Sequence, residues 1–137
     1  MSVNPRPTKE EVYEEMKKTH WSLLTNLFAT RAIVLSKYQG NSDLFKILSK
    51  IDNLISLSYY TFSVVNYSYP QYRQMYAQHF KAFKKQLQNL VNLTNKLRED
   101  QSDSVFDEIH KAFDEVDKTI KYTFKWLEEG IPPPLML

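Results

Sequence analysis

Three histidines are the side chains of this sequence that could titrate near neutral pH, and a histidine can also bind a metal ion. His20 and His79 fall on the apolar faces of the helices that we predict around them, and His110 lies near the start of the last predicted helix. At a rise of about 1.5 Å per residue, His20 and His79 reach similar heights in a helical bundle, whereas His110 lies roughly 15 Å or more from both. A metal site with three histidine ligands is therefore not expected.

Carboxylates do not complete a metal site around these histidines. Di-iron helical bundles repeat a Glu-x-x-His pair, whereas the nearest spacing here is Asp107-x-x-His110, which occurs once. The absence of cysteine excludes thiolate ligands and thiol catalysis. We expect no metal and no cofactor, and we interpret His20 and His79 as buried polar residues that hydrogen-bond to their neighbours. A ligand pair is the alternative interpretation.

Arg31 is the third polar residue that we predict to be buried, near the middle of the apolar face of the first helix. A buried guanidinium group costs several kcal/mol unless it is paired. The aspartates at the start of the last helix reach the same height in the bundle, and they are Asp103, Asp107 and Asp114. We therefore predict a buried ion pair, with an anion-binding pocket as the alternative.

One spacing is that of a known enzyme family. Arg73 and His79 form an R-x5-H pair, with Gln74 after the arginine, and this pair resembles the motif of HEPN-type ribonucleases, which are also helical bundles. The resemblance covers two residues of the chain. It implies RNA cleavage that a His79→Ala variant would lose.

Helix-breaking residues divide the chain into four long helical segments. Glycine occurs only at Gly40 and Gly130, and Pro70 is the only proline away from the ends. We predict helices over residues 8–39, 43–67, 69–100 and 103–129, with Thr8 capping the first and Ser68 the third. Short connections favour an all-α, antiparallel up-down-up-down four-helix bundle of long helices in one domain, residues 1–137, with an extended Pro-rich tail at 131–137.

Apolar residues at helical spacing predict which faces form the core. On the first helix they are Val12, Met16, Leu23, Leu24, Leu27, Phe28, Val34 and Leu35. On the second they are Leu44, Ile47, Leu48, Ile51, Ile55, Phe62 and Val65. On the last they are Val105, Ile109, Ala112, Phe113, Val116, Ile120, Phe124 and Leu127.

The twenty residues 53–72 carry no charge, in a chain whose composition is 25% charged. Their many Asn, Ser and Thr side chains argue against a membrane span. A second apolar stripe on this helix points away from the predicted core, and it consists of Leu57, Tyr60, Val64 and Tyr67. Two apolar faces need two partners, so we predict an interface here. The tail residues Leu135, Met136 and Leu137 either cover this stripe or contact another subunit.

Basic residues concentrate on the third helix, although the net charge is only +2. With helices three and four side by side, six lysines form a belt on outward faces: Lys81, Lys84, Lys85, Lys118, Lys121 and Lys125. Such a belt could follow the phosphate backbone of RNA or DNA. The alternative is a solvated face balanced by Glu115 and Glu128.

These patterns favour association over catalysis. The sequence has no phosphate-binding glycine loop, no nucleophile motif and no evident small-molecule site. The amino-terminal stretch lacks the apolar core of a signal peptide, so we expect a cytoplasmic, intracellular protein. We predict a non-catalytic bundle that binds itself or another protein, with a nucleic-acid-binding subunit of a nucleoprotein complex as the alternative.

Overall fold

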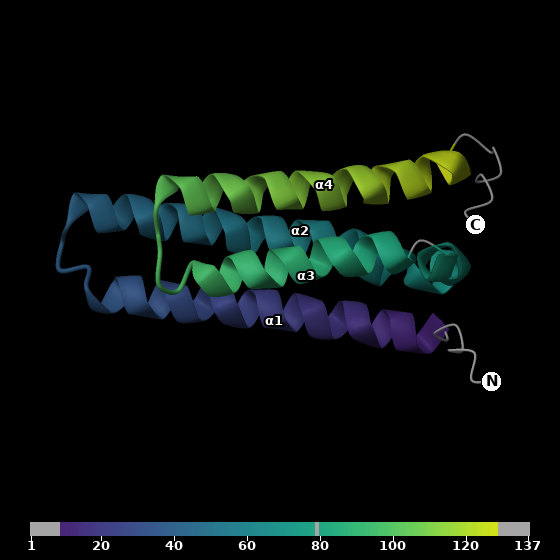
Figure 1. The fold of residues 1–137 in the computed structure, drawn as a ribbon, viewed down its shortest axis with the longest axis horizontal. Coiled ribbons are helices and arrows are strands. Elements are labelled where there is room, and N and C mark those ends of the chain that lie inside the picture. The colour runs from purple at the N-terminus through teal and green to yellow at the C-terminus, as the bar shows by residue number, and fades with distance from the viewer. Residues whose placement is uncertain (1–8, 79, 129–137) are drawn as a thin grey trace.

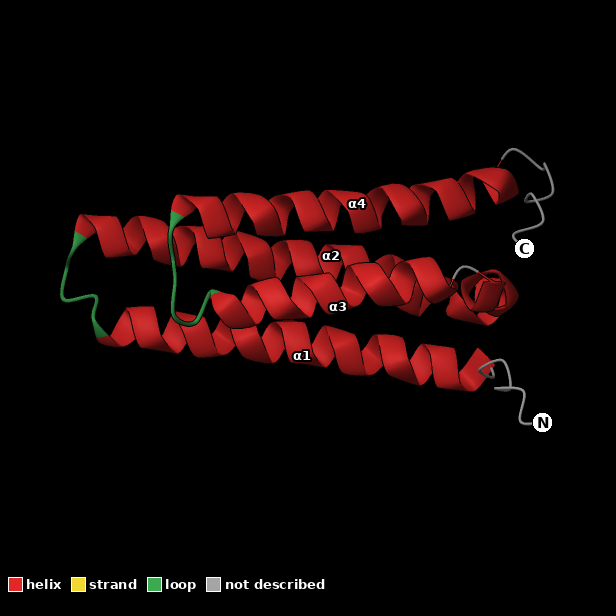
Figure 2. Cartoon of the chain, in the orientation of Figure 1, coloured by secondary structure: helices red, strands yellow, loops and turns green. Residues whose placement is uncertain are grey.

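Four helices make up the part of the chain that the computed structural model describes, which is residues 9–78 and 80–128, with side chains at 10–11, 13–63 and 84–119. They are α1 (Lys9–Ser36), α2 (Ser42–Gln78), α3 (Phe80–Lys96) and α4 (Asp103–Glu128) (Figure 1). No strand occurs in these residues, as Figure 2 shows. The prediction of an all-α chain with four helices is confirmed.

The helices lie side by side as a bundle. Helix α1 packs against α2 and α3, and α4 packs against the same two helices. In Figure 1, α1 and α4 accordingly form the two outer rows of the bundle, with α2 and α3 between them. Each helix therefore has one side that packs against its neighbours and one side that faces away from them.

The connection between α1 and α2 follows the predicted turn. Gln39 and Gly40 have positive φ angles of 40° and 77°, the left-handed conformation that commonly ends a helix. Asn41 caps α2, because its Oδ1 accepts hydrogen bonds from the backbone N–H of Asp43 at 2.9 Å and of Leu44 at 3.2 Å. The turn residues thus fix where one helix ends and the next begins.

The boundary between α2 and α3 differs from the prediction. Helix α2 continues through Ser68 and Pro70 to Gln78, so Pro70 is inside this helix and does not open the third one. Proline removes one backbone hydrogen bond and strains the preceding turn, but a helix can resume after it. Helix α3 is correspondingly short, from Phe80 to Lys96, and ends before the predicted Asp100.

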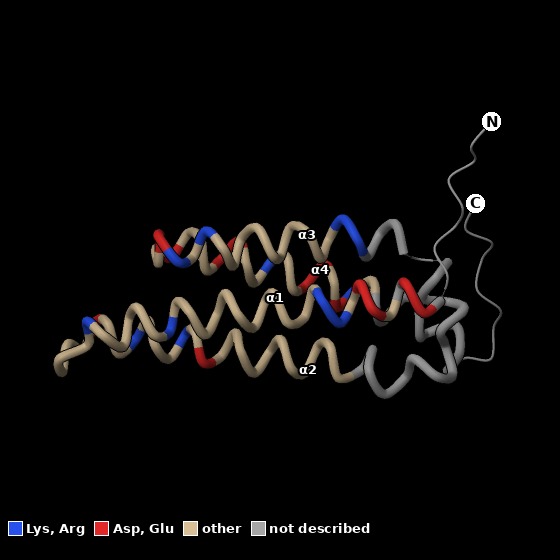
Figure 3. The backbone as a smooth tube through the Cα atoms, turned by 90° about the horizontal axis from the view of Figure 1, so that it is seen from below, with Lys and Arg blue, Asp and Glu red and all other residues tan. Residues whose placement is uncertain are grey.

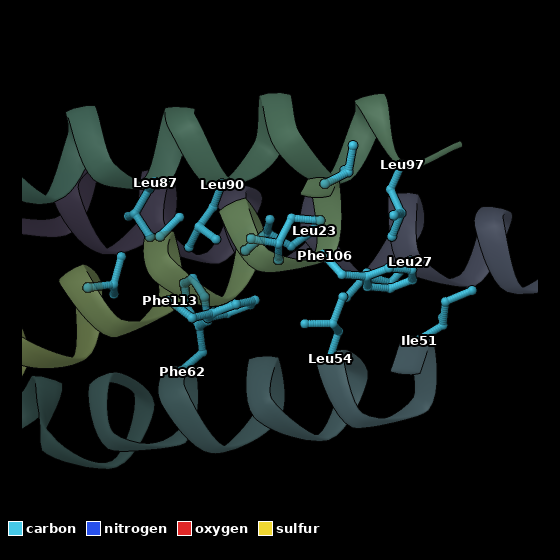
Figure 4. Close-up of a cluster of buried hydrophobic side chains, with 14 of the residues drawn as sticks. Leu23, Leu27, Ile51, Leu54, Phe62, Leu87, Leu90, Leu97, Phe106 and Phe113 are labelled. Carbon is cyan, nitrogen blue, oxygen red and sulfur yellow. The ribbon is translucent and has the colours of Figure 1, made fainter. Parts of the chain in front are cut away.

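The core is built from all four helices, as Figure 4 shows. Its fully buried side chains include Leu23 and Leu27 of α1, Leu54 of α2, Leu90 of α3 and Phe113 of α4. Most of the predicted core positions with described side chains are buried or half-buried. Phe106 and Leu54 are buried too, although the predicted stripes omit both.

Two predicted core positions on α1 are wrong. Phe28 and Leu35 are each 48% exposed. Because successive residues of an α-helix are about 100° apart, a helix that centres Leu27 on the core carries Phe28 well away from it. The same rotation separates Leu35 from the buried Val34.

A buried polar cluster connects α1 to the end of α3. The side-chain Nδ2 of Asn26 donates to the carbonyl of Val91 at 3.3 Å and to Oγ1 of Thr94 at 3.1 Å. Its Oδ1 accepts a hydrogen bond from Nη2 of Arg98 at 2.7 Å. Asn26 lies between apolar positions of α1 and is 7% exposed. The sequence patterns did not predict this cluster, because only the structure shows that this polar residue is buried.

Candidate protein-interaction surface

Exposed large apolar side chains concentrate on two of the four helices in the part of the chain whose side chains are described. Among the described side chains, all of those that are substantially exposed belong to α1 or α2, and they are Trp21, Phe28, Ile33, Leu35, Phe45, Tyr59 and Tyr60. Trp21 is 65% exposed and Tyr60 is 68% exposed. A chain of this length gains stability by burying such groups, so a concentration of them marks a surface that binds something.

The exposed residues of α1 form a stripe along the helix. Trp21, Phe28 and Leu35 are seven residues apart, which places them on nearly the same side of an α-helix. We call these three residues the apolar stripe. Thr25 and Ala32, which lie between them on the same side, are also exposed and uncharged.

Charge is nearly absent from this part of α1. Between residues 19 and 36 the only charged side chain is that of Arg31. Figure 3 shows the middle parts of α1 and α2 almost free of acidic and basic positions. The uncharged run at 53–72 is the more evident signal in the sequence, but the charge count of residues 19–36, which includes a single arginine, also marks this surface.

Small polar residues form a matching stripe on α2. Ser49, Ser56 and Ser63 are also seven residues apart, and we call them the serine stripe. Ser49 and Ser56 are exposed, and Ser63 is half-buried. Tyr59 and Tyr60 lie beside this stripe and are 50% and 68% exposed.

Three contacts set the apolar stripe beside the serine stripe. Nε of Arg31 donates to Oδ1 of Asp52 at 2.8 Å, and the rings of Tyr38 and Phe45 lie 6.3 Å apart. The imidazole ring of His20 stacks on Phe62 with the ring centroids 4.4 Å apart. Between the first two contacts, the residue number therefore rises along α1 by as much as it falls along α2. Trp21 and Ser63 also line the same hollow, of about 520 Å³.

Arg31 differs from its prediction in both burial and partner. Its side chain is 39% exposed and pairs with Asp52 of α2, which is 52% exposed, rather than with an aspartate of α4. The reason is the angle on α1, since Arg31 lies at the flank that faces α2 and not at the centre of the apolar face. Asp103 pairs instead with Lys50.

His20 is half-buried at the edge of the hollow. Its Nε2 is enclosed and has no hydrogen-bond partner among the described residues, so the predicted hydrogen bond to a neighbour is not formed there. The ring of Tyr59 meets it edge-on at 5.7 Å. Burial lowers the pKa of His20 below its ordinary value of 6.5, because desolvation disfavours the imidazolium form.

We expect this depressed pKa to make stability depend on pH. Below pH 6.5 the unfolded chain protonates at His20 before the folded protein does, so the free energy of unfolding is highest above pH 6.5 and falls as the pH drops towards the folded-state pKa. Urea titrations at several pH values give the free energy of unfolding at each pH, and this free energy should depend less on pH in a His20→Phe variant. His110 is exposed, so a His110→Gln variant is the matched control and should keep the pH dependence of the unchanged protein. An unchanged pH dependence in His20→Phe would show that burial of His20 is not its cause.

The predicted interface residues of α2 differ from one another in burial where their side chains are described. Tyr60 is exposed as predicted, but Leu57 is half-buried and packs against the core, so it does not belong to an outward stripe. The side chains of Val64 and Tyr67 lie outside the described residues. The tail residues Leu135, Met136 and Leu137 lie outside them as well.

The predicted lysine belt is described in part. Lys84, Lys85 and Lys118 are exposed, and the side chains of Lys81, Lys121 and Lys125 lie outside the described residues. Glu115 lines the same hollow as Lys85, between α3 and α4. The described part of the belt therefore carries both signs of charge, which fits a phosphate backbone less well than a purely basic groove would.

The residues proposed for catalysis lie largely outside the described residues, and the described residues can be searched for metal ligands. His79 and the side chain of Arg73 lie outside them, so the HEPN-like pair has no described geometry. Within the described residues, no group of three His, Asp or Glu side chains converges as metal ligands would. No helix there is both long enough and apolar enough to span a bilayer.

Comparison of the chain with protein-family models, with curated proteins and with solved structures gave no match.

Proposed function

We propose that this protein is a non-catalytic, antiparallel up-down-up-down four-helix bundle that acts by binding protein through one face. This face, which we call the α1/α2 face, comprises the apolar stripe, the serine stripe and the exposed Phe45, Tyr59 and Tyr60. The opposite directions of residue numbering in the contacts between α1 and α2 support the antiparallel topology.

One observation carries the proposal: among the described residues, the exposed large apolar side chains lie on α1 and α2 and not on α3 or α4. Trp, Tyr and Phe are enriched where proteins bind each other, because they bring a large contact area with little loss of side-chain entropy. The near absence of charge on the same face removes the desolvation cost that a charged surface pays on binding.

A double variant of the apolar stripe tests this function. Trp21→Ser/Phe28→Ser should weaken association at least about 100-fold, or roughly 2.7 kcal/mol, because buried aromatic anchors carry most of the energy of an interface. The measurement is native mass against concentration, together with recovery of bound protein from the expressing cell. Both residues are exposed, so the variant should keep its fold.

Gln88→Ser/His110→Ser is the matched control, since both residues are exposed on α3 and α4. It should associate as the unchanged protein does. Full association of the Trp21→Ser/Phe28→Ser variant would show that the α1/α2 face is not the binding surface. A chain ending at Gly130 separates a contribution of the tail from that of the helices, and RNA or DNA binding measured at low salt tests the lysine belt.

A further inference from the structure

The two stripes of the α1/α2 face share one repeat and one register. Trp21, Phe28 and Leu35 recur every seven residues on α1, as Ser63, Ser56 and Ser49 do on α2. The contact of Arg31 with Asp52 and that of Tyr38 with Phe45 show that α2 descends one residue as α1 ascends one. Each large residue of the apolar stripe therefore lies level with a serine of the neighbouring helix.

We propose that the partner of this face is a second copy of the chain, related to the first by a two-fold axis parallel to the helices. Such an axis keeps every residue at its height and exchanges α1 and α2 across the interface. It places Trp21, Phe28 and Leu35 of one copy over Ser63, Ser56 and Ser49 of the other. The inference rests on the proposed function and names its partner.

Size complementarity favours this axis over the other two-fold axis that could join the faces. An axis perpendicular to the helices places α1 on α1, so large side chains meet large side chains. The parallel axis places each large side chain of the apolar stripe over the small side chains of the serine stripe. Alternation of large and small residues is what allows helical surfaces to interlock closely.

Two of the three hydroxyls of the serine stripe can be covered at little cost. Oγ of Ser49 donates to the carbonyl of Phe45 at 3.1 Å, and Oγ of Ser63 donates to the carbonyl of Tyr60 at 2.7 Å. These donors are satisfied within their own helix, so an apolar side chain placed over them does not leave a buried donor without a partner. At these two positions the serine stripe is polar in composition but accepts an apolar neighbour.

Charge complementarity points to the same axis. Arg31 and Asp52 sit side by side near the middle of the face, and both side chains remain partly exposed. The parallel axis sets the Asp52 of one copy beside the Arg31 of the other, so the four charges alternate in sign. An alternating arrangement of this kind favours the matched register and disfavours shifted ones.

The exposed area approaches the size of a specific interface. At about 200 Å² for a fully exposed large side chain, the exposed parts of Trp21, Phe28, Leu35, Phe45 and Tyr59 amount to roughly 500 Å² per copy. Two copies would cover about 1,000 Å² from these side chains alone, which is about the minimum expected of a specific interface. The residues between the stripes add to this area.

Disulfide cross-linking tests the arrangement in a chain that has no cysteine of its own. Two full-length variants, Phe28→Cys and Ser56→Cys, are oxidised separately and as an equal mixture. The mixture should give at least about tenfold more covalent dimer than either variant alone, because a disulfide needs Cα atoms within about 7 Å and the axis brings residues 28 and 56 of different copies together. A mixture of Phe28→Cys with Ser104→Cys, which is exposed on α4, is the control and should not cross-link.

Other outcomes would overturn the inference. Cross-linking of Phe28→Cys with itself as strongly as in the mixture would indicate the perpendicular axis. A native mass of one chain at every concentration of the unchanged protein would exclude the dimer. If such a monomer still retained a cellular protein that the Trp21→Ser/Phe28→Ser variant lost, the proposed function would stand with another partner, whereas a dimer unaffected by that variant would overturn the function as well.

Discussion

Replacing Phe113 with alanine should lower the free energy of unfolding by about 3–5 kcal/mol, because truncating a buried aromatic side chain loses its transfer energy and leaves a cavity. Phe113 is 1% exposed and lies in the shared core drawn in Figure 4. A urea titration followed by circular dichroism measures the change in the free energy of unfolding. If the slope of this free energy against urea concentration is the same in both proteins, they expose equal surface on unfolding and the difference is one of stability.

Phe28→Ala is the matched control for this prediction. It makes the same chemical change at a residue that is 48% exposed, so we expect a loss below about 1 kcal/mol in the monomer. The comparison also tests the rotation of α1, because the apolar pattern of the sequence assigned both phenylalanines to the core. Equal losses in the two variants would mean that Phe28 is buried in solution and that the apolar stripe is not an exposed surface.

The second large effect is expected at the buried polar cluster between α1 and α3. An Asn26→Leu variant removes the acceptor of Arg98 together with two hydrogen bonds donated to α3. The guanidinium group of Arg98 is half-buried, and its enclosed Nε has no hydrogen-bond partner among the described residues. We expect a loss of roughly 2–4 kcal/mol, since a buried polar group that loses its partner keeps its desolvation cost.

A double variant separates the cost of a stranded charge from the loss of the hydrogen bonds. Asn26→Leu/Arg98→Leu removes both members of the contact, and replacing a buried polar pair by apolar groups is often close to neutral. The double variant should therefore be more stable than Asn26→Leu in the same urea titration. If its loss of stability relative to the unchanged protein equalled the sum of the losses in Asn26→Leu and in Arg98→Leu, the cluster would stabilise the fold through its hydrogen bonds rather than merely avoid an unpaired charge.

The sequence predicted local features well where one or two residues decide them. The turn at Gly40 and Asn41 and the start of α4 at Asp103 follow from backbone preference and capping, which act over a few residues. The break expected at Pro70 was wrong for the converse reason. A proline raises the energy of a helix without forbidding it, and packing along the rest of the helix decides whether it continues.

The candidate surface could be predicted only in part. Tyr60 was identified from the uncharged run of α2, and it is exposed. Phe28 and Leu35 were assigned to the core, since an apolar residue next to a core position is equally compatible with the inner and the outer face of a helix. The partner of Arg31 was misassigned for the same reason, because its flank position becomes known only when α2 is in place.

The sequence by itself determined that this protein is helical, where its chain turns, that residues 53–72 lack charge, and that residues 19–36 carry a single charged side chain. Glycine, capping side chains and the helical repeat act within one segment, so they need no knowledge of the others. The tertiary structure decided which way each helix turns, and hence that Leu27 faces inward while Phe28 faces out. The helical repeat fixes the angle between two residues, but only contact with neighbouring helices fixes the direction of that angle in space.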